Sequence, residues 1–192
     1  QIWLRRLEPD GQEWEEQRIS FLADEKEEGL LSASCVLQAE GQYVLTAEAR
    51  DRAGNESAQE AAAVLDRTPP ALSGQEMWAA GKAVLPDQVG QEQWYYADGE
   101  ARIQVSLGDS GAGAARARLY YQAETGDRWT VLADTGEEGL PAQNSQLSGV
   151  LEAPGSGWIG LWAVDRCGNE LGSEEEPERL FAVRLEGGQA HG

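Results

Sequence analysis

The sequence predicts an all-β protein that contains two copies of one structural unit. Three observations support this prediction. Four short motifs recur in the same order further along the chain, apolar and polar residues alternate in short segments, and clusters of Gly, Asp, Asn and Pro separate those segments. Short alternating strands between turn-forming clusters are typical of a sandwich or barrel.

The repeat sets the domain organisation. Leu22–Leu30 and Leu132–Leu140 are identical at seven of nine positions. The other matches are Gly11–Trp14 with Gly126–Trp129, Val36–Gly41 with Val150–Gly155, and Asp51–Glu56 with Asp165–Glu170. All four are offset by 110 to 115 residues, which chance does not produce. Residues 71–115 have no counterpart in the first copy, so we expect 1–66 to be a partial repeat that holds only the C-terminal strands.

Within the first copy, residues 43–50 place apolar side chains at every second position, which is the period of a half-buried strand. Asp51–Asn55 follows as a predicted hairpin turn, because Gly and Asn tolerate positive φ and Asp accepts hydrogen bonds from the next amides. Residues 57–65 are Ala-rich, which favours helix. Their counterpart at 179–185 alternates as a strand does, so both segments are predicted to be strands.

The two copies join at Asp66–Pro70. Proline fixes φ, restricts the residue before it and cannot donate to a ladder. We therefore expect a short, stiff linker at 67–70 and a rod-like tandem rather than freely jointed units. The complete unit then spans 71–186, and the Gly-rich end at 187–192 is expected to be a flexible tail.

In the second copy, segments 103–107, 116–121 and 159–163 alternate in the same way. The last of these differs because Trp158 and Trp162 make its other face apolar as well. The acidic run at 174–178 is predicted to be a charged loop before the final strand.

Three motifs of the first copy resemble the C-terminal half of a bacterial immunoglobulin-like repeat. They are Gly41-Gln-Tyr43, the Asp51–Asn55 turn, and Asp66–Pro70 beyond the next strand. In the second copy, Ile103–Gly111 resembles the B strand and its following turn, and Arg118–Tyr121 fits strand C. The resemblance implies tandem immunoglobulin-like Greek-key β-sandwiches, the first one truncated, with about seven strands in the second.

The resemblance also implies that Tyr43 is similar to the tyrosine corner of such sandwiches. The second copy departs from the pattern, because Gly157-Trp158 stands where Gly-x-Tyr is expected. The family is mostly found in exported and cell-wall proteins of bacteria, which implies an extracellular or cell-surface location.

Composition excludes several classes of function. A net charge of −19 repels phosphates, so ordinary nucleic-acid binding is excluded. No apolar run approaches the roughly 20 residues that span a bilayer. Residue 1 is Gln, the only Met is Met77, and no signal-peptide pattern occurs, so we expect a piece of a longer protein. Cys35 and Cys167 fall in different copies, which disfavours a disulfide between them.

The residues for catalysis are sparse, and we expect no enzyme and no catalytic residue. The only histidine, His191, lies in the Gly-rich tail, where it cannot build a packed Ser-His-Asp or Cys-His site. The 34 acidic residues make carboxylate pairs common, and the acidic runs are better explained as solvated edges and loops.

A structural calcium ion is the one cofactor that the acidic turns suggest. Asp51, Asp66 and Asp165 are the candidates, because hard oxygen ligands suit calcium and these residues lie at turns and at the joint. No EF-hand spacing occurs. We favour the alternative that these residues only form turns, so no cofactor is expected.

The seven tryptophans are the candidate binding residues. Exposed Trp faces could stack on sugar rings, and Trp158 and Trp162 are the possible ligand-stacking pair because Ile159 and Leu161 occupy the opposite strand face. The alternative is that the tryptophans supply the core. Trp14 and Trp129 recur at one repeat position, which favours a structural role for them.

The sequence therefore predicts non-catalytic spacer repeats of a larger bacterial surface or secreted protein. The alternatives are an adhesin-like module that binds a glycan or a host protein, and an accessory domain of a secreted carbohydrate-active enzyme. The expected partners are neighbouring domains of the parent protein. An open apolar face on the truncated copy would also favour self-association.

Overall fold

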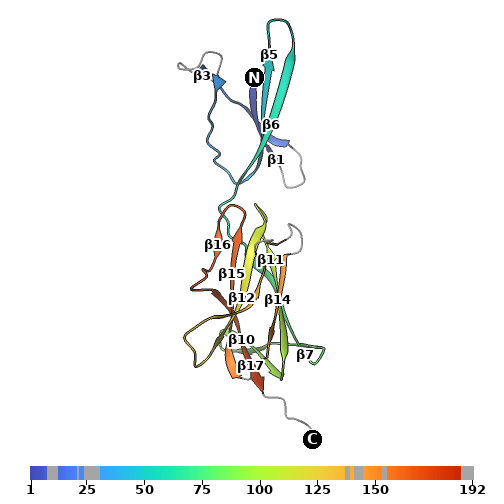
Figure 1. Ribbon diagram of the computed structural model, residues 1–192, viewed down its shortest axis with the longest axis vertical. Helices are drawn as coiled ribbons and strands as arrows, with labels where there is room; N and C mark the ends of the chain where they lie inside the picture. The colour runs from blue at the N-terminus through green and yellow to red at the C-terminus, as the bar shows by residue number, and fades with distance from the viewer. Residues whose placement is uncertain are drawn as a thin grey trace. The chain divides into compact units, whose positions relative to one another are not determined.

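The computed structural model describes residues 1–7, 13–20, 22–23, 31–136, 139–140, 145–152 and 155–186. Every regular element within these ranges is a β-strand, which confirms the all-β prediction. The chain divides into two compact units, Gln1–Arg67 and Thr68–Gly192 (Figure 1). The predicted tail at 187–192, with His191, lies outside the described residues.

The first unit is built around a four-stranded antiparallel sheet of order β2-β1-β5-β6. Its strands are β1 (Ile2–Leu7), β2 (Glu13–Arg18), β5 (Gly41–Arg50) and β6 (Glu56–Leu65), and a short separate pair is formed by β3 (Leu22–Ala23) and β4 (Leu31–Ser32). The strand predicted at 57–65 is confirmed. Pairing with β5 along ten register positions overrides the helix propensity of its alanines.

The second unit contains two main sheets. The larger has the order β13-β12-β15-β17-β10-β9, with β16 paired to β15, and the smaller has the order β14-β11-β7-β8. The larger sheet contains β9 (Asp87–Val89), β10 (Glu92–Asp98), β12 (Ala114–Ala123), β13 (Thr130–Asp134), β15 (Gly155–Asp165), β16 (Glu170–Leu171) and β17 (Glu178–Glu186). The smaller contains β7 (Ala71–Ala79), β8 (Lys82–Val84), β11 (Ala101–Gly108) and β14 (Ser145–Leu151). Strands β10 and β17 pair in parallel, and the other described pairs are antiparallel.

Both sheets of the second unit contribute to one buried apolar cluster. Met77, Ile103 and Val105 come from the smaller sheet, and Leu119, Ile159, Leu161 and Val183 come from the larger. The alternation predicted for 103–107 is confirmed, because inward residues of β11 are buried and their neighbours are not. This arrangement is compatible with a β-sandwich.

The main sheet of the first unit matches part of the larger sheet of the second. The order β2-β1-β5-β6 corresponds to β13-β12-β15-β17, and β5 and β15 both end in the repeated Asp-centred turn. In the second unit, β10 continues the sheet beyond β17. Across the described ranges of the first unit, no strand pairs with the far edge of β6.

Candidate functional site

The Asp-centred turns are confirmed in both copies. Asp165 is only 3% exposed, and its Oδ1 accepts hydrogen bonds from the amides of Cys167 and Asn169, each at 2.8 Å. Its Oδ2 accepts from Nδ2 of Asn169 at 2.7 Å. The exposed Asp51 accepts in the same way from the amide of Asn55 at 2.9 Å and from its Nδ2 at 2.7 Å. The repeated Asp-x-x-Gly-Asn pattern therefore forms the same turn in both copies.

These contacts lower the pKa of both carboxyl groups. For Asp51 the largest cause is the hydrogen bond from the Asn55 side chain. For Asp165 burial acts in the opposite direction and raises the pKa, but the hydrogen bonds from Asn169 and the turn amides outweigh it. Both turns are therefore stabilised by an ionised aspartate.

Two of the calcium candidates belong to the first unit. Asp51 follows β5 at the hairpin turn, and Asp66 follows the last residue of β6 at the opposite end of the same hairpin. Asp165 belongs to the second unit, where its carboxylate lies within 4.8 Å of that of Asp109. Sequence reasoning did not select Asp109, although its Asp-Ser-Gly motif marks a turn of the same kind.

Most oxygen atoms of the Asp109–Asp165 pair are already engaged in turn formation. Oδ1 of Asp109 accepts from the amides of Gly111 and Gly113 at 2.8 and 3.1 Å. Oδ2 of Asp109 is buried, and among the described residues it has no hydrogen-bond partner. The other three oxygens act as acceptors within their turns, which agrees with a turn-forming role for Asp165.

The two candidate stacking residues differ in exposure. Trp162 is 4% exposed, and the guanidinium carbons of Arg116 and Arg118 lie 5.8 and 5.4 Å from its ring centroid. Trp158 is half-buried, with Arg179 at 5.1 Å over its ring and Trp94 in edge contact at 5.8 Å. Of the possible stacking pair, Trp162 is therefore buried, because neighbouring-strand arginines cover its ring.

Ion pairs hold one of these arginines in place. Arg118 on β12 donates to the carboxylates of Asp134 and Glu174. The hydrogen bond to Asp134 is the largest cause of the raised pKa of Arg118. The arginine and its carboxylates thus form a polar layer over Trp162.

The position of Tyr43 is occupied differently in the two copies. The Tyr43 hydroxyl donates to the carbonyl of Ala39 at 2.5 Å, which is the backbone contact that a tyrosine corner makes. Gly157 occupies the equivalent position in the second copy. A Cβ there would lie 2.7 Å from Cζ of Tyr121, so the ring of Tyr121 fills this space from the adjacent strand β12. The Tyr121 hydroxyl donates to the carbonyl of Ser156 at 3.3 Å.

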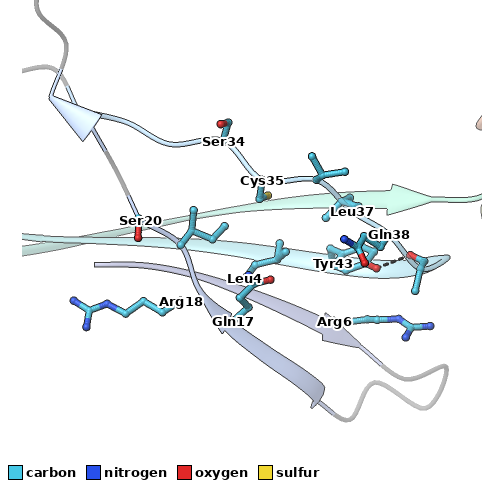
Figure 2. Close-up of a pocket in the computed structure, with 13 residues that line it drawn as sticks. Leu4, Arg6, Gln17, Arg18, Ser20, Ser34, Cys35, Leu37, Gln38 and Tyr43 are labelled. Carbon is cyan, nitrogen blue, oxygen red and sulfur yellow. Dashed lines mark hydrogen bonds between the residues drawn. The ribbon is translucent and has the colours of Figure 1, made fainter.

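A pocket of about 720 Å³ lies between the sheet of the first unit and the chain segment 34–39. Figure 2 shows this segment running above Leu4 and Tyr43, with Cys35 among its residues. The described residues that line the pocket include Arg6 and Arg18 but no carboxylate or imidazole.

The cysteines lie at exposed positions. Cys35 belongs to the segment over the pocket, and Cys167 belongs to the Asp165–Asn169 turn. Neither cysteine is in a disulfide, so each unit carries one accessible thiol.

Comparison with known proteins gives no assignment. No model of a known protein family matches the chain, and no curated protein matches it. Over the described residues, no helix has the length and apolar character needed to cross a membrane.

Proposed function

We propose that the chain supplies tandem immunoglobulin-like Greek-key repeats that act as non-catalytic spacers in a larger bacterial surface or secreted protein. The observation that carries this proposal is the repetition of one four-strand order in both units, with the same Asp-centred turn after β5 and β15. A spacer needs repeated, self-contained modules and no reaction centre. The repeated strand order supports that role.

Three further features support the immunoglobulin-like part of the proposal. The Tyr43–Ala39 hydrogen bond has the form of a tyrosine corner. The second unit has two sheets that share one core. The first unit has counterparts of only four strands of the larger sheet, which is the pattern of a truncated repeat. The acidic surface favours a soluble exterior, as an exported protein needs.

The spacer role requires a stiff joint, and the two exposed cysteines allow a direct measurement. Spin labels on Cys35 and Cys167 report the distance between the units by pulsed electron resonance without further substitution. A stiff Thr-Pro-Pro joint should give a narrow distance distribution. A matched variant with Pro69→Gly and a Gly-Ser insertion after Arg67 should give a broad one. A broad distribution in the unaltered chain would overturn the spacer proposal.

We also propose that the first unit self-associates through a second copy of the chain. Strand β6 is ten residues long and almost fully exposed, and it carries no Lys or Pro to protect its edge. In the second unit the corresponding edge of β17 is covered by β10. Sedimentation velocity over a concentration series should show association that Ala62→Lys abolishes. A monomer at every concentration would contradict this.

A further inference from the structure

We propose that the outer face of the smaller sheet in the second unit carries a binding groove for a neutral saccharide, with Trp78 as its floor. The groove encloses about 680 Å³ and is lined by Trp78, Gly81, Asp98, Glu100, Arg102 and Gln104, among others. This volume is within the range of small-molecule sites, which is roughly 300–1,000 Å³. The proposal is independent of the spacer role.

Strand pairing places the groove. Met77 points into the core and is 1% exposed, so Trp78 on the same strand projects to the opposite, outer face. Arg102 on β11 is the direct register partner of Trp78. The β7–β8 turn and the Gly99-Glu100 link between β10 and β11 close one end. Rigid strands therefore supply the floor, and two tight turns supply the rim.

Trp78 differs in its ring contacts from the other tryptophans whose side chains the structure describes. Trp3 and Trp162 lie under arginines, Trp94 and Trp158 contact each other, and Trp129 contacts Tyr120. Trp78 is half-buried, but among the described residues its ring makes no stacking or cation–π contact. An aromatic face at the floor of a hollow, on which no described ring or cation stacks, is available to stack on the apolar face of a sugar.

The rim contains a strained residue. Ala80 has φ of 48°, the one positive value among the described non-glycine residues, and it lines the groove beside Gly81. Alanine in this conformation costs about 1–2 kcal/mol. Strain of this kind tends to persist where the local geometry serves a function. Here the tight turn shapes one wall of the groove next to Trp78.

The polar groups around Trp78 indicate a neutral, hydroxyl-rich ligand. Arg102 and Gln104 provide donors, while Asp98, Glu100 and the Gln104 carbonyl provide acceptors. Mixed donors and acceptors beside an aromatic ring match the vicinal hydroxyls of a saccharide. The two carboxylates and the net charge of −19 disfavour acidic sugars. Arg102 opposes a cationic ligand.

The test follows the indole N–H signals of the ¹⁵N-labelled full chain during titration. The probes are cellohexaose, maltohexaose and N-acetylchitohexaose at millimolar concentrations, with a heparin hexasaccharide and tetramethylammonium as charged comparisons. We expect at least one neutral probe to shift the Trp78 signal. Gln104→Ala should weaken the binding that the Trp78 signal reports. Trp78→Leu removes this signal, so its affinity is measured by calorimetry and should fall by about tenfold or more. Gln104 lies on the sheet surface, so its variant tests the site if Trp78→Leu fails to fold.

The matched control is Tyr96→Ala. Tyr96 is 42% exposed on the larger sheet and is not among the lining residues of the groove, so this variant should bind as the unaltered chain does. The proposal is overturned if no neutral probe shifts the Trp78 signal. It is also overturned if a charged probe binds more tightly, or if the shifts fall on Trp94 and Trp158 instead.

Discussion

The buried aspartate of the second turn allows a quantitative test of what the repeated motif contributes to stability. Replacing Asp165 with alanine removes the acceptor of three hydrogen bonds of 2.7 to 2.8 Å. The backbone amides of Cys167 and Asn169 and the side-chain Nδ2 of Asn169 lose these bonds. A hydrogen bond to a charged group contributes about 1.5–3 kcal/mol, and bonds that share one carboxylate are not additive. We expect Asp165→Ala to lower the free energy of unfolding of the second unit by about 2–4 kcal/mol.

The first copy provides a matched control in the same chain. Asp51 accepts from Asn55 with the same geometry but is exposed, so water replaces the lost contacts in Asp51→Ala. We expect a clearly smaller loss of stability in this variant. Urea unfolding followed by tryptophan fluorescence measures the loss of unfolding free energy in Asp51→Ala and in Asp165→Ala. Equal losses in the two variants would refute the argument that burial makes the Asp165 turn important.

The effect of Asp165 should also depend on pH. The folded-state pKa of Asp165 is lower than its ordinary value, so the ionised group stabilises the folded unit above the unfolded pKa of about 3.9. This contribution is lost as pH falls through the lowered folded-state pKa. The stability difference between the unaltered chain and Asp165→Ala should therefore be full at pH 7 and shrink below about pH 4. A difference that stays constant down to pH 2 would show that the carboxylate charge is not involved.

Other substitutions test local packing, the glycine and alanine variants by chemical denaturation and the arginine variant by fluorescence quenching. Gly157→Ala should cost about 1–3 kcal/mol, because its Cβ would clash with the backbone carbonyl oxygen of Gln122 and with the ring of Tyr121. Gly74→Ala should cost little, because the nearest atom to its Cβ is Cβ of Ser106 at an ordinary 3.7 Å. Ala80→Gly should stabilise the second unit by about 0.5–1 kcal/mol, because glycine adopts a positive φ without steric strain. A loss of stability would contradict the argument that Ala80 is strained. Arg118→Ala should raise the accessibility of Trp162 to acrylamide quenching, and unchanged quenching would show that the arginine does not cover the ring.

The sequence could predict the strands because their burial is one-sided. Residues 103–107 alternate because one face meets the core, and the Ala-rich strand β6 became predictable only through its repeat partner β17. The turns were predictable because Asp, Gly and Asn act within five residues of one another.

Features that depend on strand register were not predictable. Trp162 is buried because Arg116 and Arg118, more than forty residues earlier, lie beside it across β12 and β15. Asp109 approaches Asp165 because two turns meet at one end of the second unit. The hollow around Trp78 depends on where two turns place their backbone. No pattern of neighbouring residues in the sequence encodes these long-range contacts.

The parallel pairing of β10 and β17 has a consequence for a chain held under tension. Strand β17 is bound on one side through seven register pairs with β15 and on the other through five with β10. Pulling it lengthwise loads both ladders in shear, so many hydrogen bonds must break together. Strand β6, also the last of its unit, is bound to β5 alone within the described residues. Because β6 has ten register pairs in one ladder and β17 has two ladders, we expect the first unit to yield before the second under load.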